Sequence, residues 1–205
     1  MTGETATPVL ILASGSASRR HMLEAAGISF EVMTPNVDED AFKDEFRAQG
    51  IDARSLADAL AELKARRLSS RIPGALVLGA DQTLELDDGA MIDKAVDRDD
   101  AAAILRCLSG RTHFLHSAAV VCEGGTPVWR QIETARMTVR ELSDSFIADY
   151  LDREWDECRW CVGCYRIEGP GAQLFSAIRA THFAIQGLPL LGLLDFLRVR
   201  GVLAR

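Results

Sequence analysis

The chain has 205 residues, of which 48% are hydrophobic and 26% charged, a balance that fits an ordinary globular protein of one domain and excludes a disordered or fibrous chain. A formal net charge of -7 argues against a long nucleic-acid footprint, because proteins that bind a phosphate backbone usually present a basic patch. A small anionic substrate, which needs only a local cluster of Lys and Arg, stays compatible with this charge.

The apolar segments of the chain do not suit a membrane. The first eight residues, MTGETATP, lack the basic region of a signal peptide, and the apolar run 9–13 is too short for a signal core. The leucine-rich tail is interrupted by Pro189, Gly192 and Asp195, and so falls short of the roughly 20 apolar residues of a transmembrane helix. We therefore expect a cytoplasmic protein.

The N-terminal segment predicts a strand, a turn and a helix. The continuous apolar run 9–13 is typical of a strand covered on both faces. The small, hydroxyl-rich turn 14–18 follows it. A helix over 19–26 then ends at Gly27, a residue that tolerates the left-handed conformation found after helices.

The next segments continue this alternation. Residues 30–33 predict a second strand, and an acidic segment, 38–40, follows it. A helix that carries Lys64 should begin near Ser55, because leucines recur at helical spacing after it, at Leu56, Leu60 and Leu63.

The apolar run 75–80 predicts another buried strand, and Asp81 should emerge where this strand leaves the core. Residues 83–86 continue as a strand to an Asp-Asp-Gly turn. Five further elements are expected: a helix from Asp97 or Asp100 to Leu108, a hairpin of strands 112–122 and 128–139, a helix from Ser143, and a closing helix over 189–200. Because strands and helices interleave without a repeat, the expected class is α/β with a mixed sheet.

Three groups of residues form a candidate phosphate site, although each is weak evidence alone. They are Ser14 and Arg19 of the first turn, the lysines Lys64 and Lys94, and the carboxylates Glu39 and Asp81. A turn that opens a helix offers free N–H groups to an anion, and an arginine adds a bidentate donor. The alternative interpretation is a tight connection with solvated arginines.

No P-loop, Rossmann or nucleophile-elbow motif occurs, so the sequence does not support these site types. Asp81 taken alone would more often be an exposed turn carboxylate than a catalytic one. Its expected position at the end of a buried strand favours a functional role, because open α/β sheets bind ligands there.

Other reactive residue types have structural interpretations. Cys158, Cys161 and Cys164 could form part of a metal or iron-sulfur site, but a fourth ligand is not evident, and reduced structural thiols are expected. His113 and His116 would point to opposite faces of a strand, which does not suit a shared metal.

Three aromatic residues could stack on a nucleobase, namely Trp155, Trp160 and Tyr165. Packing is the more common role for aromatic side chains at such positions.

Taken in order, these residues resemble the Maf family of nucleoside triphosphate pyrophosphatases over nearly the whole chain. The stretch 10–20, LILASGSASRR, is similar to the family's opening LILASxSxxR motif. The later matches are Asp38-Glu39, Leu63-Lys64-Ala65, Gly79-Ala80-Asp81-Gln82, Lys94, Leu108-Ser109-Gly110, the stretch 163–172 and the stretch 187–190. Because they keep the family's order along the chain, together they are highly specific.

The resemblance implies a single Maf/inosine-triphosphatase-like domain over residues 1–205, with a mixed sheet flanked by helices and a cleft between two lobes. It implies hydrolysis between the α and β phosphates of a nucleoside triphosphate, with Asp81 as the catalytic carboxylate. A divalent cation, Mg²⁺ or Mn²⁺, would be held by Glu39 and Asp81. The triphosphate would be bound by four residues, namely Ser14, Arg19, Lys64 and Lys94. A homodimer is also implied.

Departures from the family pattern concern three positions in two motifs. Ala17 stands where proline is usual, and the lysine motif reads Asp93-Lys94-Ala95, without the usual flanking glycine and proline.

Substrate choice in the family follows three positions, which here are Ser18, Gln82 and Glu168. Gln82 and Glu168 resemble the branch associated with 7-methyl-GTP, whereas Ser18 stands where that branch tends to carry tryptophan. A carboxylate suits a guanine-like base with adjacent N–H donors, and a methylated base with positive charge. The alternatives are a pyrophosphatase directed to dTTP and UTP, and a non-catalytic nucleotide-binding regulator linked to septum formation.

Overall fold

A seven-stranded mixed sheet organises residues 8–204, which are the residues that the computed structural model describes. The strands are β1 (Leu10–Ala13), β2 (Glu31–Val32), β3 (Leu76–Leu86), β4 (Met91–Ile92), β5 (Thr112–Glu123), β6 (Thr126–Val139) and β7 (Phe175–Arg179). They lie in the order β2-β1-β3-β5-β6-β7, and β4 pairs with β3 off this path. β1 is parallel to β2 and β3, and the remaining pairs are antiparallel.

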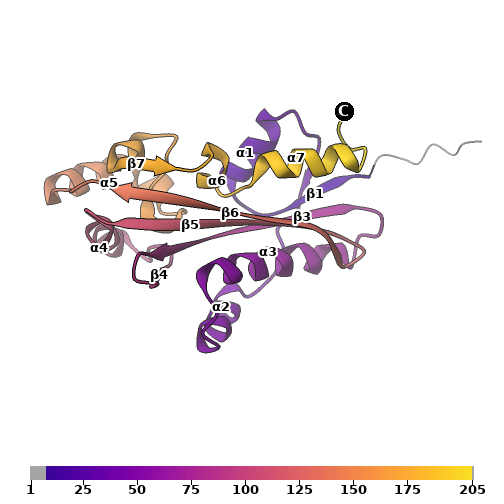
Figure 1. Cartoon of the computed structure of the whole chain (residues 1–205), viewed down its shortest axis with the longest axis horizontal. Helices are drawn as coiled ribbons and strands as arrows, with labels where there is room; N and C mark the ends of the chain where they lie inside the picture. Colours follow the sequence, from indigo (N-terminus) through magenta and orange to yellow (C-terminus); the bar gives the residue numbers. More distant parts are fainter. Residues whose placement is uncertain (1–7, 205) are drawn as a thin grey trace, which may run out of the picture.

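Helices cover both faces of the sheet (Figure 1). They are α1 (Ala17–Ala25), α2 (Glu39–Ala48), α3 (Ala53–Ser69), α4 (Arg98–Leu108), α5 (Asp144–Cys158), α6 (His182–Ile185) and α7 (Leu190–Val199), with the 3-10 turns η1 (Val162–Cys164) and η2 (Pro170–Leu174). α1, α6 and α7 lie over one face, α3 lies over the other, and α2 lies outside α3. The expected α/β class with a mixed sheet flanked by helices is confirmed.

The buried apolar residues form two large clusters that meet on β3. One contains Leu84 and joins β3 to α4 and α5. The other contains Ala80 and joins β3 to β1, α1 and α7. The segment 81–83 lies between these two residues. A pocket lined by Asp81, Gln82 and Thr83 opens there, and the expected cleft between two lobes stays a prediction.

The sheet leaves part of one edge of β3 unpaired at the same place. β1 pairs with β3 as far as Gly79, and β4 begins to pair with β3 at Leu84. Along this edge, residues 80–83 therefore have no strand partner among the described residues, although β5 pairs with them on the other side. The carbonyl of Ala80, a residue of this edge, accepts a hydrogen bond from the side chain of Arg19.

The position of Asp81 differs from the expectation. Asp81 lies in the middle of a continuous strand rather than at the end of one, because β5 pairs with β3 residue by residue from Val77 to Leu86. It is β1 and not β3 that ends beside Asp81. The carboxylate therefore extends from a rigid central strand.

Two helices begin earlier than expected, because residues outside the apolar pattern cap them. α1 begins at Ala17, since the Ser16 hydroxyl accepts a hydrogen bond from the backbone N–H of Arg19. α3 begins at Ala53, since the Asp52 carboxylate accepts one from the backbone N–H of Ser55 at 2.7 Å. The cap expected at Ser55 thus lies three residues earlier.

The central hairpin and the later helices agree with the expectation. Gly124 and Gly125 have φ values of 56° and 81°, as a tight turn between β5 and β6 requires. Asp97 caps α4, and Ser143 caps α5. The closing helix is α7.

His113 and His116 are buried and point to opposite faces of β5, as expected. His113 Nε2 lies 2.6 Å from the Tyr165 hydroxyl, and His116 Nε2 lies 2.8 Å from the Glu85 carboxylate. Tyr165 is itself buried and packs edge-on against Phe175, so it is a core residue rather than a stacking surface for a ligand.

Burial lowers the pKa of His113 to about 4. Since the unfolded chain has a histidine pKa of about 6.5, its stabilising effect is complete above that pH and is lost as pH falls toward 4. We expect His113→Gln to reduce the pH dependence of the unfolding free energy in this window, by at most about 1.4 kcal/mol per pH unit. Urea unfolding at several pH values measures it. The matched control is His21→Gln, an exposed histidine, and equal slopes for both variants would contradict the prediction.

Among residues 8–204, no helix has the length and apolar character needed to cross a membrane. The interpretation of residues 1–7 as lacking a signal sequence lies outside the described residues.

Candidate functional site

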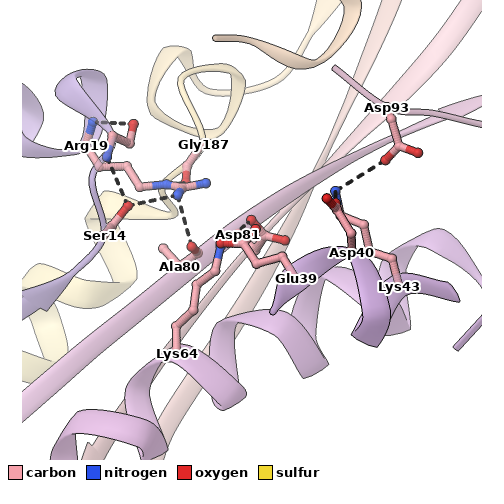
Figure 2. Close-up of polar contacts among 11 residues, drawn as sticks. Ser14, Arg19, Glu39, Asp40, Lys43, Lys64, Ala80, Asp81, Asp93 and Gly187 are labelled. Carbon is pink, nitrogen blue, oxygen red and sulfur yellow. Dashed lines mark hydrogen bonds and ion pairs between the residues drawn. The ribbon is translucent and has the colours of Figure 1, made fainter. Parts of the chain in front are cut away.

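The candidate site is centred on Lys64, which α3 places beneath β3. The Lys64 ammonium lies 3.0 Å from Asp81 Oδ1 and 3.0 Å from Glu39 Oε1 (Figure 2). Lys64 is 6% exposed, whereas the side chains of Asp81 and Glu39 are 13% and 39% exposed. A buried ammonium needs such partners, because an uncompensated charge inside a protein is strongly unfavourable. The structure therefore brings together three residues that are distant in the sequence.

Gly79 allows α3 to approach β3 closely enough for this contact. A Cβ added at Gly79 would lie 2.7 Å from the backbone nitrogen of Ala65, and closer still to the carbonyl oxygen of Ala61. These two residues lie on either side of Lys64 in the sequence. Only glycine fits between the backbones, so Gly79 sets the distance between Lys64 and Asp81.

Arg19 connects the first turn to the open edge of β3. Its Nη1 donates to the carbonyl of Ala80 at 2.9 Å and to the hydroxyl of Ser14 at 3.2 Å, and its Nε donates to the carbonyl of Gly187 at 2.9 Å. Desolvation by burial lowers the pKa of Arg19, and the negative charges of Asp81 and Glu39 oppose that shift.

These bonds change the interpretation of Arg19. The sequence predicted a bidentate donor for an anion, yet two of its nitrogens are held by the protein. Among the residues that the structure describes, Nη2 has no hydrogen-bond partner and is the nitrogen left for a ligand. Ser14 likewise supports Arg19 and the N–H of Ser16.

Lys94 follows β4 and belongs to the same electrostatic environment. Desolvation lowers its pKa, the negative charge of Asp81 opposes that shift, and the positive charge of Arg19 adds to it. Lys94 also lines the pocket that contains Glu39 and Asp81. The two lysines that the sequence assigned to one site are therefore found together.

Three charged residues of this pocket were missed by sequence reasoning, namely Lys43, Arg47 and Asp93. Glu39, Lys43 and Arg47 follow each other at intervals of four residues and so form one stripe along α2. The four-residue interval is the sequence pattern that could have placed them on one face of a helix. It was not used because this part of the chain was expected only as an acidic segment.

The three expected specificity residues differ in their exposure and in their hydrogen bonds. The side-chain nitrogen of Gln82 donates to Ser117 Oγ at 2.8 Å and to the carbonyls of Ala184 and Ile185 at 3.1 and 3.0 Å. Gln82 thus fixes α6 to the sheet, and its side-chain oxygen is the atom left for a ligand. Ser18 is partly exposed on α1, and Glu168 is exposed before η2.

The cysteine cluster lies beside the site. Burial raises the pKa of Cys158 to about 12 and that of Cys164 to about 11, so both are protonated thiols near neutral pH. Desolvation and the charge of Glu168 raise the pKa of the partly exposed Cys161, and Lys94 opposes that shift. Within residues 8–204, no set of three or more His, Cys, Asp and Glu side chains could hold a metal ion.

Comparisons with known proteins identify the family to which this chain is similar. A sequence model described as Maf-like protein matches residues 9–200. A protein from Sphingopyxis alaskensis, named nucleoside triphosphate pyrophosphatase, is 50% identical over 94% of this chain and 98% of its own length. One from Caulobacter vibrioides with the same name is also 50% identical, over 96% of this chain and 98% of its own length.

Among solved structures, a dITP/XTP pyrophosphatase from Mycobacterium abscessus matches with a TM-score of 0.44 and 15% identity, over 94% of this chain and 95% of that one.

Proposed function

The chain belongs to the Maf-like protein family, and we propose that it hydrolyses a nucleoside triphosphate to the monophosphate and pyrophosphate in the pocket around Asp81. The observation that carries the proposal is the Lys64 ammonium, held at 3.0 Å from both Asp81 and Glu39. Lys43, Arg47 and Lys94 line the same pocket. These cations suit a polyanion, because hydrogen bonds from charged Lys and Arg side chains are stronger than those from neutral donors.

The carboxylates also fit a divalent cation, Mg²⁺ or Mn²⁺. Mg²⁺ is usually bound by one or two carboxylates together with substrate phosphates, and not by a cage made of protein alone. Glu39 and Asp81 supply two such carboxylates, close enough to share the Lys64 ammonium. The bound cation would neutralise charge on the phosphoryl oxygens.

Each side chain of the site has a separate role in hydrolysis. Water is a weak nucleophile, so Asp81 accepts the proton of the attacking water as it adds to the α phosphorus. Lys64 holds the Asp81 carboxylate in place through a hydrogen bond of 3.0 Å. Lys94 and the free Nη2 of Arg19 stabilise the negative charge of the transition state, and pyrophosphate leaves.

The proposed substrate is 7-methyl-GTP, and Glu168 is the residue on which this preference rests. Its carboxylate is exposed, and the neighbouring Arg166 pairs with Glu154 and Glu157 and not with Glu168, so Glu168 can accept bonds from the N–H edge of a guanine. Its negative charge also favours a methylated, cationic base. A homodimer and a cytoplasmic location stay predictions.

Pyrophosphate release from a panel of nucleotides tests the substrate. With Mg²⁺ or Mn²⁺, we expect kcat/KM to be highest for 7-methyl-GTP, followed by GTP, and lower for dTTP, UTP and CTP. Glu168→Gln should reduce the ratio of 7-methyl-GTP to GTP turnover by about tenfold, since about 1.4 kcal/mol of charge preference is lost. Glu141→Gln provides a control on another exposed carboxylate.

Three results would change this assignment. A maximum on dTTP or UTP would support the alternative pyrophosphatase and exclude the 7-methyl-GTP preference. An unchanged ratio in Glu168→Gln would remove Glu168 from base recognition. No release from any nucleotide would favour the non-catalytic nucleotide-binding regulator linked to septum formation.

A further inference from the structure

Helix α2 presents a line of charged side chains to the pocket. Glu39, Lys43 and Arg47 all line the pocket, and the four-residue interval places neighbours about 6 Å apart along the helix. Glu39 is at the end of the line that contacts Lys64. Lys43 and Arg47 therefore place cationic side chains one and two turns along α2 from Glu39.

The two cations already hold an anionic group. Asp93 accepts from Arg47 Nη2 at 2.6 Å and from Lys43 Nζ at 3.3 Å, and Figure 2 shows the bond to Lys43 beside the Asp81 group. A carboxylate thus fits between an arginine and a lysine that belong to another element. Phosphate oxygens have the same requirement for paired donors.

The ion pairs of Asp93 with Lys43 and Arg47 can be replaced by contacts with another anion. The side chains of Lys43, Arg47 and Asp93 are 20%, 34% and 47% exposed, and ion pairs with such access to water contribute little to stability. A phosphate group brings more charge and more acceptor oxygens than one carboxylate. It can therefore displace Asp93 from the two cations.

We propose that Lys43 and Arg47 form a subsite for the pyrophosphate half of the substrate, which Asp93 occupies in the free protein. This inference rests on the proposed function and extends it to Lys43 and Arg47, which lie outside the family's motifs. Binding of pyrophosphate would release Asp93, the neighbour of Lys94, and would fix α2 over the pocket. No residue of α2 is fully buried, so polar contacts of this kind contribute to its position beside those of the partly buried Phe42 and Phe46.

Calorimetric titration of the full chain with inorganic pyrophosphate, in metal-free buffer, tests the subsite. We expect Arg47→Gln and Lys43→Gln each to weaken binding about tenfold, because each removes a charge-assisted bond worth about that factor. Asp93→Asn should tighten binding severalfold, because it removes the competing anion. A merely structural Asp93 would have the opposite effect, since its loss would free α2.

Controls separate binding from folding. Arg106→Gln breaks an ion pair of similar length, 2.7 Å to Asp144, and should bind pyrophosphate as the natural protein does. Arg47→Lys keeps the charge and should retain most of the affinity if Arg47→Gln proves unstable. Binding of GMP, which lacks the pyrophosphate half, should be the same in Arg47→Gln and in the natural protein.

Several outcomes overturn the subsite: no pyrophosphate binding by the natural protein, undiminished binding in Arg47→Gln and Lys43→Gln, or weaker binding in Asp93→Asn. Failure of the proposed function is a different result. In that case the protein would bind pyrophosphate with the expected variant pattern and hydrolyse no nucleoside triphosphate.

Discussion

Asp81→Asn is expected to lower nucleotide turnover by about a hundredfold to ten-thousandfold, the range lost when a general base is removed. Asparagine has nearly the same shape as aspartate, so it keeps a polar group beside Lys64 but cannot take a proton from water. The cations that line the pocket are unchanged, and nucleotide affinity should therefore be retained. Pyrophosphate release and calorimetric nucleotide binding are measured on the same preparation.

The substitution also affects the buried ammonium, which would keep only Glu39 as an anionic partner. Loss of a hydrogen bond to a charged group costs about 1.5–3 kcal/mol, so turnover must be measured well below the melting temperature. Asp195→Asn is the matched control, because Asp195 is an exposed carboxylate paired with Arg198 on α7. Full turnover in Asp81→Asn would exclude Asp81 as the base, and loss of binding together with turnover would indicate a role in substrate affinity.

The sequence predicted the helix and the strand that carry Lys64 and Asp81 better than the distance between these residues. The apolar run before Asp81 correctly indicated a buried strand, and the helical leucines correctly placed Lys64 on α3. The distance of 3.0 Å between Lys64 and Asp81 depends on the packing of α3 against β3, which no local pattern encodes. Likewise, the open edge of β3 arises from where β1 ends and β4 begins, a property of long-range pairing.

The residues that were missed have a common physical cause. Sequence reasoning finds helices by a long apolar stripe, and α2 carries only Phe42 and Phe46 at helical spacing among many charged residues. Lys43 and Arg47 were therefore not assigned to a helix or to the site. The contacts of Gln82 could not be predicted for a different reason. Its resemblance to a specificity position is visible in the sequence, whereas its side-chain nitrogen donates to Ser117 and to carbonyls of α6, which are distant in the chain.

Gly79→Ala is expected to separate Lys64 from Asp81 without removing any functional group. The added methyl group would overlap the backbone of α3 at Ala61 and Ala65, and a backbone cannot rotate away as a side chain can. Overpacking of this kind costs about 1–3 kcal/mol of unfolding free energy. A displacement of about 1 Å at a catalytic group can cost about a hundredfold in rate, so turnover should fall by that order in protein that is still folded.

A control variant of similar stability distinguishes the loss of unfolding free energy from the displacement of Lys64 relative to Asp81. Leu105→Ala creates a cavity in the cluster around α4 and α5 and should cost about 2–5 kcal/mol, while leaving α3 and β3 in contact. At a temperature where both variants are folded, Leu105→Ala should keep most of its turnover and Gly79→Ala should not. Equal turnover in the two variants would mean that the closeness of α3 and β3 at Gly79 does not set the geometry of Lys64 and Asp81.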